Sequence, residues 1–206
     1  MAHGALNLTP VQNLALTYAN SDVKAPFALL MAFDSRLADV VLTSSEPMIA
    51  QLKLAWWRDA LSAARDKRPK GEPMLALLSE IESAERVKGV ASDMLSSVDA
   101  WEILSVQEDA QLEHFSDHRG DAVFKSFARW NGAAVTQDIE MAGRRWALAD
   151  MMARTGRSDV SVSPQPVRLS RPLRPLTILE RGAVGELRSG RQSAGVSLLW
   201  HALTGL

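Results

Sequence analysis

The sequence predicts an all-α protein, a single-domain helical bundle over residues 1–206, and three observations lead to this prediction. Apolar residues recur at three- and four-residue spacing along most of the chain, which is the period of a helix face. No segment shows a convincing strand-like alternation of apolar and polar residues, and no internal repeat is visible. The 206 residues, 47% of them hydrophobic, are enough for one domain with a sizeable core.

Capping residues and prolines mark the helices of the N-terminal third. Thr9 and Pro10 predict the start of a short helix, because proline is favoured in the first turn. A second helix is predicted over residues 22–42, where FALLMAFDSRLADVVL gives it a broad apolar face. A third is predicted to start at residues 45–47, SEP, and to end at the breaker-rich segment 66–73, DKRPKGEP.

The middle of the chain predicts further helices, one of them with a break. Their ranges are residues 73–87, 90–104, 108–130 and 132–154. The helix over residues 73–87 is amphipathic, since its leucines and isoleucine recur at helical spacing. The helix over residues 108–130 is expected to be interrupted at HRG, residues 118–120. Gly143 is small enough to allow a close crossing with another helix.

The helical pattern fails after Gly156. Prolines at positions 164, 166, 172 and 175 forbid a continuous helix, so residues 157–175 are predicted to form an exposed loop rich in proline and arginine. Two short helices, residues 176–187 and 193–206, are predicted to finish the chain.

Composition excludes several classes of site. The chain has no cysteine, which excludes disulfides, thiolate catalysis, zinc–thiolate sites and cysteine-bound iron–sulfur clusters. A reducing cytoplasm fits this composition. No run reaches the roughly 18 apolar residues of a membrane span, and the start MAHGALNLTP does not predict a secretory signal. We therefore expect a cytoplasmic protein, with a peripheral position at the inner membrane as the other location considered.

Charge is distributed unevenly along the chain. From Arg144 to the end there are ten arginines, no lysine and four acidic residues, giving +6; because the net charge is −1, the rest carries −7. This asymmetry permits contact with an anionic partner or a membrane surface. A solvated face with an arginine-rich loop is the alternative explanation. Nucleic-acid binding is not expected, since the arginines lack interleaved aromatic residues.

Two adjacent tryptophans, Trp56 and Trp57, lie between Lys53 and Arg58 on the third helix. The apolar residues of this helix cover more than half of its cylinder, which predicts a central helix with both tryptophans in the core. Lys53 is four residues from Trp57 and is close enough to cover its ring. Lys53 and Arg58 are interpreted either as snorkelling cations or as one wall of a ligand site.

Several motifs resemble the squalene/phytoene synthase superfamily. They are AFDSRLADVV at 32–41, SEP at 45–47, QLKLAWWRDAL at 51–61, GDAVFKSFARWNGAAV at 120–135, AGRRWALADMMAR at 142–154, RPLRPLTILERGA at 171–183 and LLWHALTGL at 198–206. The nearer likeness is to a divergent branch, found in proteobacteria and mitochondria, that includes the mitochondrial respiratory complex I assembly factor 6. The resemblance implies a shortened helical bundle of the isoprenoid (trans-prenyl) synthase type.

Catalytic members of this family join two prenyl diphosphates head to head. They use magnesium ions held by acidic residues at i and i+4 on each of two facing helices, because residues four apart share a helix face. In the first motif only Asp39 matches, since Ala38 and Leu42 stand where the family has acids. Asp34 lies roughly 140° from Asp39 around the helix and does not restore the pair. Arg36, three residues before Asp39, is placed to neutralise it.

The second motif is also incomplete. Asp150 has Trp146 and Arg154 as its four-residue neighbours, so no carboxylate shares its face. Asp138 and Glu140 are two apart and point to different sides. We therefore expect that no acidic side chains converge on a metal cluster, and we assign no catalytic residue, no metal and no cofactor.

The leading hypothesis is a non-catalytic relative, a pseudoenzyme that has kept the fold. By resemblance it acts in the assembly of respiratory complex I and docks on a protein partner or a lipid at the inner face of the cytoplasmic membrane. One alternative is a prenyl-diphosphate transferase in which Arg36, Lys53 and Arg58 contact phosphate and Asp39 holds a magnesium ion. Another is an isoprenoid- or lipid-binding module without chemistry.

His114 and His118 form the other pattern considered. Their i, i+4 spacing, with acidic neighbours, is compatible with a surface metal site. The bare pattern is common and no further strong ligand is predictable, so a solvated helix face is the interpretation adopted.

Overall fold

The computed structural model describes residues 6–106, 111–157, 161–163, 165 and 167–189. All regular secondary structure in these residues is helical, which confirms the predicted all-α class. The α-helices are α1 (Pro10–Thr17), α2 (Ser21–Thr43), α3 (Pro47–Ser62), α4 (Pro73–Ser83), α5 (Val90–Val106), α6 (Leu112–Gly120), α7 (Ser126–Trp130), α8 (Gln137–Thr155) and α9 (Arg174–Ser189). None of these helices is both long enough and apolar enough to cross a membrane.

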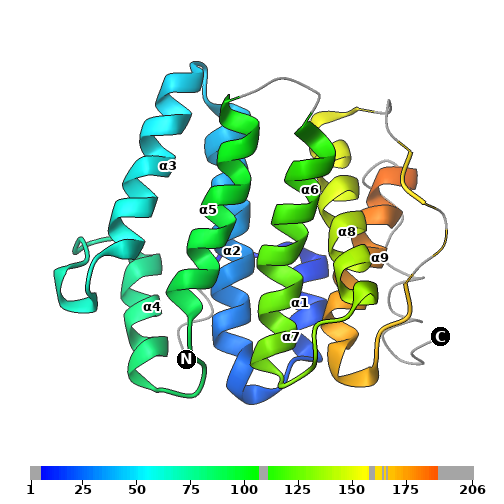
Figure 1. Cartoon of the computed structure of the whole chain (residues 1–206), viewed down its shortest axis with the longest axis horizontal. Helices are drawn as coiled ribbons and strands as arrows, with labels where there is room; N and C mark the ends of the chain where they lie inside the picture. Colours follow the sequence, from blue (N-terminus) through cyan, green and yellow to red (C-terminus); the bar gives the residue numbers. More distant parts are fainter. Residues whose placement is uncertain (1–5, 107–110, 158–160, 164, 166, 190–206) are drawn as a thin grey trace.

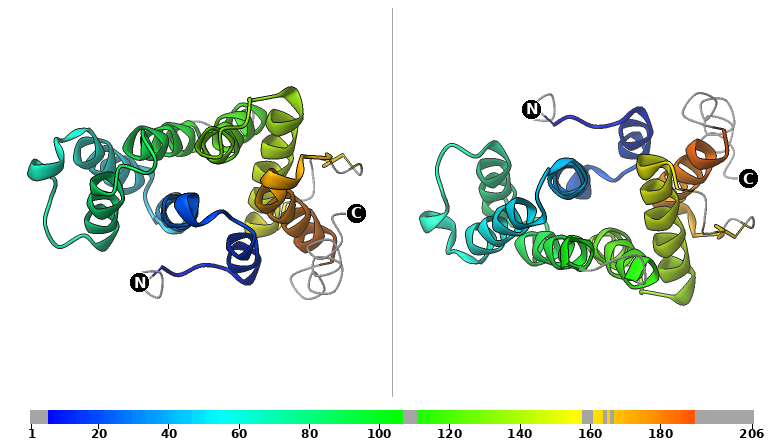
Figure 2. Two further views of the ribbon diagram at one scale, coloured as in Figure 1. Left: turned by 90° about the horizontal axis from the view of Figure 1, so that it is seen from below. Right: turned by 90° about the horizontal axis from the view of Figure 1, so that it is seen from above.

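The second helix forms the centre of the bundle. Helices α3 and α4 lie towards one end of the molecule and α8 and α9 towards the other, with α2 between them (Figure 1 and Figure 2). Residues 26–34 of α2 are all buried, as expected of a helix with neighbours on every side. It packs against α1, α3, α4 and α5. Buried apolar side chains from α1 to α9 form one continuous cluster around it.

The prediction that the tryptophan helix is central was wrong. Helix α3 lies near one end of the bundle, where it packs mainly on α5 (Figure 1). Its inner face buries Trp57, which is 4% exposed, whereas Trp56 is 42% exposed and is not a core residue. The broad apolar surface of α3 is only partly buried, because α3 has neighbouring helices on one side only.

The break predicted at residues 118–120 is not observed, because these residues belong to α6 and the helix continues beyond them through a π-helical turn. Helix α6 ends at Gly120, a π-helical turn spans Asp121–Lys125, and α7 follows directly. Gly120 faces Gly143 of α8, and a Cβ atom built on Gly120 would lie 2.4 Å from the carbonyl carbon of Gly143. The predicted close crossing at Gly143 is thus confirmed, and it brings the backbones of α6 and α8 into contact.

The predicted loop is shorter than expected. Gly156 ends α8 in the left-handed conformation, φ 69°, which glycine adopts readily. Helical structure resumes at a 3₁₀ turn, Arg171–Leu173, followed by α9. Pro172 and Pro175 therefore lie in first turns, where proline is tolerated, rather than in the loop. The helix predicted over residues 193–206 lies outside the described residues.

Candidate functional site

A buried ionic cluster joins three helices inside the bundle: Asp34 of α2, Arg119 of α6 and Asp150 of α8. The side chains of Arg119 and Asp34 are each 1% exposed. The Nε and Nη2 atoms of Arg119 donate to the Asp34 carboxylate at 2.9 and 2.6 Å, and Nη2 also donates to Asp150 at 2.6 Å. One guanidinium thus bridges two carboxylates that are 116 residues apart in sequence; such charge-assisted pairs are strong when their geometry is good.

Surrounding groups complete this cluster. The indole of Trp101 donates to Asp34 at 2.8 Å, and Arg154 donates to Asp150 at 2.8 Å. The Arg119 guanidinium carbon lies 4.4 Å from the ring centroid of Trp146 and 4.9 Å from that of Trp101. Hydrogen bonds and aromatic faces together offset the cost of removing these charges from water.

Both Asp150 and Arg119 are held in their charged forms. Burial alone would raise the pKa of Asp150, but Arg119 and Arg154 more than offset this, and its pKa lies below the ordinary carboxyl value. Burial would lower the pKa of Arg119, and the two carboxylates instead raise it. Arg119 and Asp150 are therefore ionised at neutral pH.

Two acidic side chains from different helices do converge inside the bundle, but the cation between them is the Arg119 guanidinium. Asp34 and Asp150 come from the two helices that, by the resemblance, carry the acidic motifs, and they meet on Arg119. No group of three or more aspartate, glutamate or histidine side chains could hold a metal ion within the described residues. Magnesium requires near-octahedral oxygen coordination. The Arg119 guanidinium occupies the position between Asp34 and Asp150 at which their carboxylate oxygens would have to bind a magnesium ion. These residues therefore do not fit a magnesium cluster.

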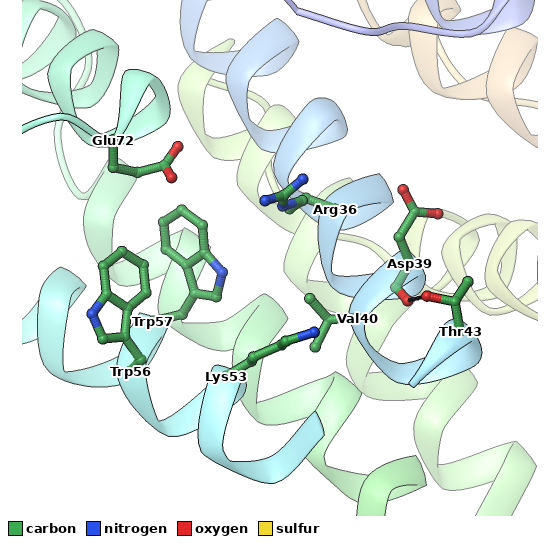
Figure 3. Close-up of a pocket in the computed structure, with 8 residues that line it drawn as sticks. All are labelled: Arg36, Asp39, Val40, Thr43, Lys53, Trp56, Trp57 and Glu72. Atoms are coloured by element: carbon green, nitrogen blue, oxygen red, sulfur yellow. Dashed lines mark hydrogen bonds between the residues drawn. The ribbon is translucent and has the colours of Figure 1, made fainter. Parts of the chain in front are cut away.

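A second feature, here called the α2–α3 groove, contains most of the residues proposed to bind a ligand. It has a volume of about 340 Å³, and its lining includes Arg36, Asp39 and Lys53 (Figure 3). Arg36 and Lys53 extend into the space between the helices, while the Asp39 carboxylate points away from them (Figure 3). In the described structure Arg36 forms no ion pair with Asp39, so the expected neutralisation is not observed.

Aromatic rings and one further acid complete the lining of the α2–α3 groove. Trp56 and Trp57 contact each other edge to face, with ring centroids 4.9 Å apart. Glu72, which precedes α4, also lines the groove, and its carboxylate accepts a hydrogen bond from the backbone N–H of Met74. Glu72 could not be predicted as part of this groove, because it comes from the segment between α3 and α4 rather than from either helix of the groove. Its only sequence signal is its position before Pro73, where it caps α4.

Arg58 does not share this groove. Its guanidinium donates to Asp99 at 2.7 Å and to Glu102 at 2.6 Å, both on α5. Lys53 and Arg58 are five residues apart, which places them roughly 140° apart around α3. The grouping of Arg58 with Arg36, Asp39 and Lys53 in one ligand site is therefore corrected: Arg58 joins α3 to α5.

The other candidate residues lie on ordinary surfaces or packing contacts. Arg145 is buried and pairs with Glu180 of α9 at 2.6 Å, so it links α8 to α9, and it also contributes to the lining of a cavity beside Arg144. Arg144 is more exposed and pairs with Asp117 of α6. His114 and His118 are exposed, and the Nδ1 atom of His118 lies 2.9 Å from the backbone oxygen of His114. The described residues provide no third ligand beside them.

The described residues form an all-α bundle, which agrees with the isoprenoid-synthase type of fold that the resemblance implies. The chain belongs to the squalene/phytoene synthase family, whose sequence model matches residues 12–118, slightly more than half of the chain. This match covers both helices of the α2–α3 groove and Asp34, and it ends one residue before Arg119. No curated protein and no solved structure matches the chain.

Proposed function

We propose that this chain is a squalene/phytoene synthase-like protein that has lost metal-dependent prenyl transfer and acts through its surface. The observation that carries this proposal is the bridge that Arg119 forms between Asp34 and Asp150. Ionising a prenyl diphosphate calls for cations that leave oxygen sites open to the phosphates. The donors of Arg119 are already directed at protein acceptors, including the backbone oxygen of Ala147.

Incubation with farnesyl or geranylgeranyl diphosphate and magnesium tests the loss of catalysis. We expect neither pyrophosphate release nor any joined C30 or C40 product, while a catalytic phytoene synthase assayed in parallel with geranylgeranyl diphosphate, which needs no reductant, gives both pyrophosphate and a C40 hydrocarbon. Product formation by the full chain would refute the proposal, because Arg119 would then have to leave its carboxylates for metal to enter.

The biological role that we propose is in the assembly of respiratory complex I, at a protein partner or a lipid on the inner face of the cytoplasmic membrane. It is supported by the resemblance to the divergent branch that contains the mitochondrial assembly factor. Deletion of the gene, followed by native gel electrophoresis of membranes, should lower the amount of assembled complex I. Unchanged abundance of the complex would argue against this role and leave the proposed loss of catalysis intact.

A second candidate function is binding of a prenyl diphosphate without turnover. It is favoured by the α2–α3 groove, where Arg36 and Lys53 face the same space and both Trp56 and Trp57 contribute to the lining. A non-hydrolysable farnesyl thiodiphosphate would serve as the probe. Calorimetric binding that is abolished in the Arg36→Ala/Lys53→Ala double variant would support this function over a purely structural groove.

A further inference from the structure

The exposed side of α3 has an apolar surface that the bundle leaves uncovered. Met48, Leu52 and Trp56 follow one another at four-residue spacing and are 68, 66 and 42% exposed, and Ile49 beside them is 38% exposed. Scattered exposed apolar residues are normal, but a continuous stripe on one helix is characteristic of an interaction site. We call these four residues the α3 stripe.

Cations border this stripe on one flank. Trp56 belongs both to the stripe and to the lining of the α2–α3 groove, where Lys53 and Arg36 also lie (Figure 3). In the part of the chain that the structure describes, neither cation forms an ion pair. Glu72 accepts a backbone hydrogen bond, and the Asp39 carboxylate points away from both cations. The groove volume of about 340 Å³ is ample for a phosphate group.

We propose that the α3 stripe and the α2–α3 groove together bind the surface of a bilayer containing anionic phospholipid. The stripe would enter the boundary between headgroups and acyl chains, while Arg36 and Lys53 contact lipid phosphates. Trp56 lies where apolar and charged surfaces meet, which suits an indole at a membrane interface. This inference specifies which surface would make the membrane contact named in the proposed function. It rests on the proposed function only for the biological role of that contact.

The charge of this surface favours a bilayer over a second copy of the chain. Helix α3 lies towards one end of the molecule and packs mainly on α5, so its outer side is left accessible (Figure 1 and Figure 2). In a two-fold antiparallel pairing centred on Leu52, the two Lys53 side chains would lie on the same flank and repel each other. A membrane with anionic headgroups instead supplies the opposite charge to Lys53 and Arg36.

Flotation of the full chain with vesicles tests the proposal. The chain should bind vesicles of phosphatidylcholine mixed with phosphatidylglycerol, and more weakly those of phosphatidylcholine alone. Leu52→Glu should reduce binding at least about tenfold, because an apolar side chain at the interface is replaced by a charge. Arg36→Ala/Lys53→Ala should reduce binding to the mixed vesicles by about 25-fold, since each cation near an anionic surface contributes about a factor of five.

Met141→Glu is the control, because Met141 is an exposed apolar residue on α8, outside the α3 stripe, and is 43% exposed against 66% for Leu52. It should bind vesicles as the unmodified chain does, and all variants should keep the same melting temperature. Absence of vesicle binding, or binding that Leu52→Glu leaves unchanged, would overturn the proposal. A dimer that Leu52→Glu dissociates, in a chain that ignores vesicles, would overturn it in favour of self-association. None of these outcomes depends on prenyl turnover or complex I abundance.

Discussion

Replacing Arg119 with leucine is expected to lower the free energy of unfolding by about 3–5 kcal/mol, because two buried carboxylates would lose their shared cation. Asp34 has hardly any contact with solvent and would keep only the indole of Trp101 as a strong donor. A domain of this kind is stabilised by about 5–15 kcal/mol in total, so a loss of this size is a large and measurable part of its stability. Urea denaturation followed by circular dichroism at neutral pH measures the change.

Two comparisons separate this electrostatic loss from lost packing. Arg58→Leu removes an exposed pair with Asp99 and Glu102 and should cost no more than about 1 kcal/mol. The pKa of Asp150 is lowered in the folded protein, so its ionised form contributes stability that is lost as the pH falls through that lowered pKa. Arg119→Leu removes this contribution. The difference in free energy of unfolding between the unmodified chain and the variant should therefore become smaller as the pH is lowered. A deficit under about 1 kcal/mol, or one that does not change with pH, would contradict the role of Arg119.

The helix starts could be predicted because they depend on local chemistry. Pro10, Pro47 and Pro73 each lie in the first turn of a helix, as their sequence contexts predicted. Helix ends were predicted less well: the helix predicted to reach residue 87 ends at Ser83. No proline marks that end, so the pattern of apolar residues alone could not locate it.

The ionic cluster could not be predicted because its members come from three helices. Counting residues at i and i+4 tests one helix at a time, and by that test Asp34 and Asp150 are isolated acids. The sequence predicts a helix break at residues 118–120, and this prediction gives Arg119 no role of its own. Gly120 is small enough to allow another helix to pack closely against α6. The crossing with Gly143 brings α6 against α8, and this allows Arg119 to reach Asp150.

Helical geometry explains which of the four proposed ligand residues meet at the α2–α3 groove. Arg36, Asp39 and Lys53 were grouped from motif resemblance, and the structure brings all three to one groove. Arg58 was grouped with them by sequence proximity, although its helical angle already placed it on another side of α3. The exposure of Trp56 depends on how many neighbours α3 has, and this is fixed by the arrangement of the whole bundle.

Gly120→Ala is expected to destabilise the protein by about 3 kcal/mol, although the same change in an ordinary helix stabilises by about 0.5–1 kcal/mol. The sign reverses because the new methyl group would lie 2.4 Å from the Gly143 carbonyl carbon, and backbone cannot move aside as a side chain can. Thermal and urea unfolding would measure the change.

Gly182→Ala on α9 provides the matched control for Gly120→Ala. Its added methyl group would also meet an atom at 2.4 Å, but that atom is a side-chain carbon of Val11. Adding Val11→Ala should therefore restore most of the stability that Gly182→Ala loses, whereas truncating a neighbouring side chain cannot relieve Gly120→Ala. If Gly120→Ala were neutral or stabilising, α6 and α8 would not be in backbone contact, and the position of Arg119 between Asp34 and Asp150 would lose its structural basis.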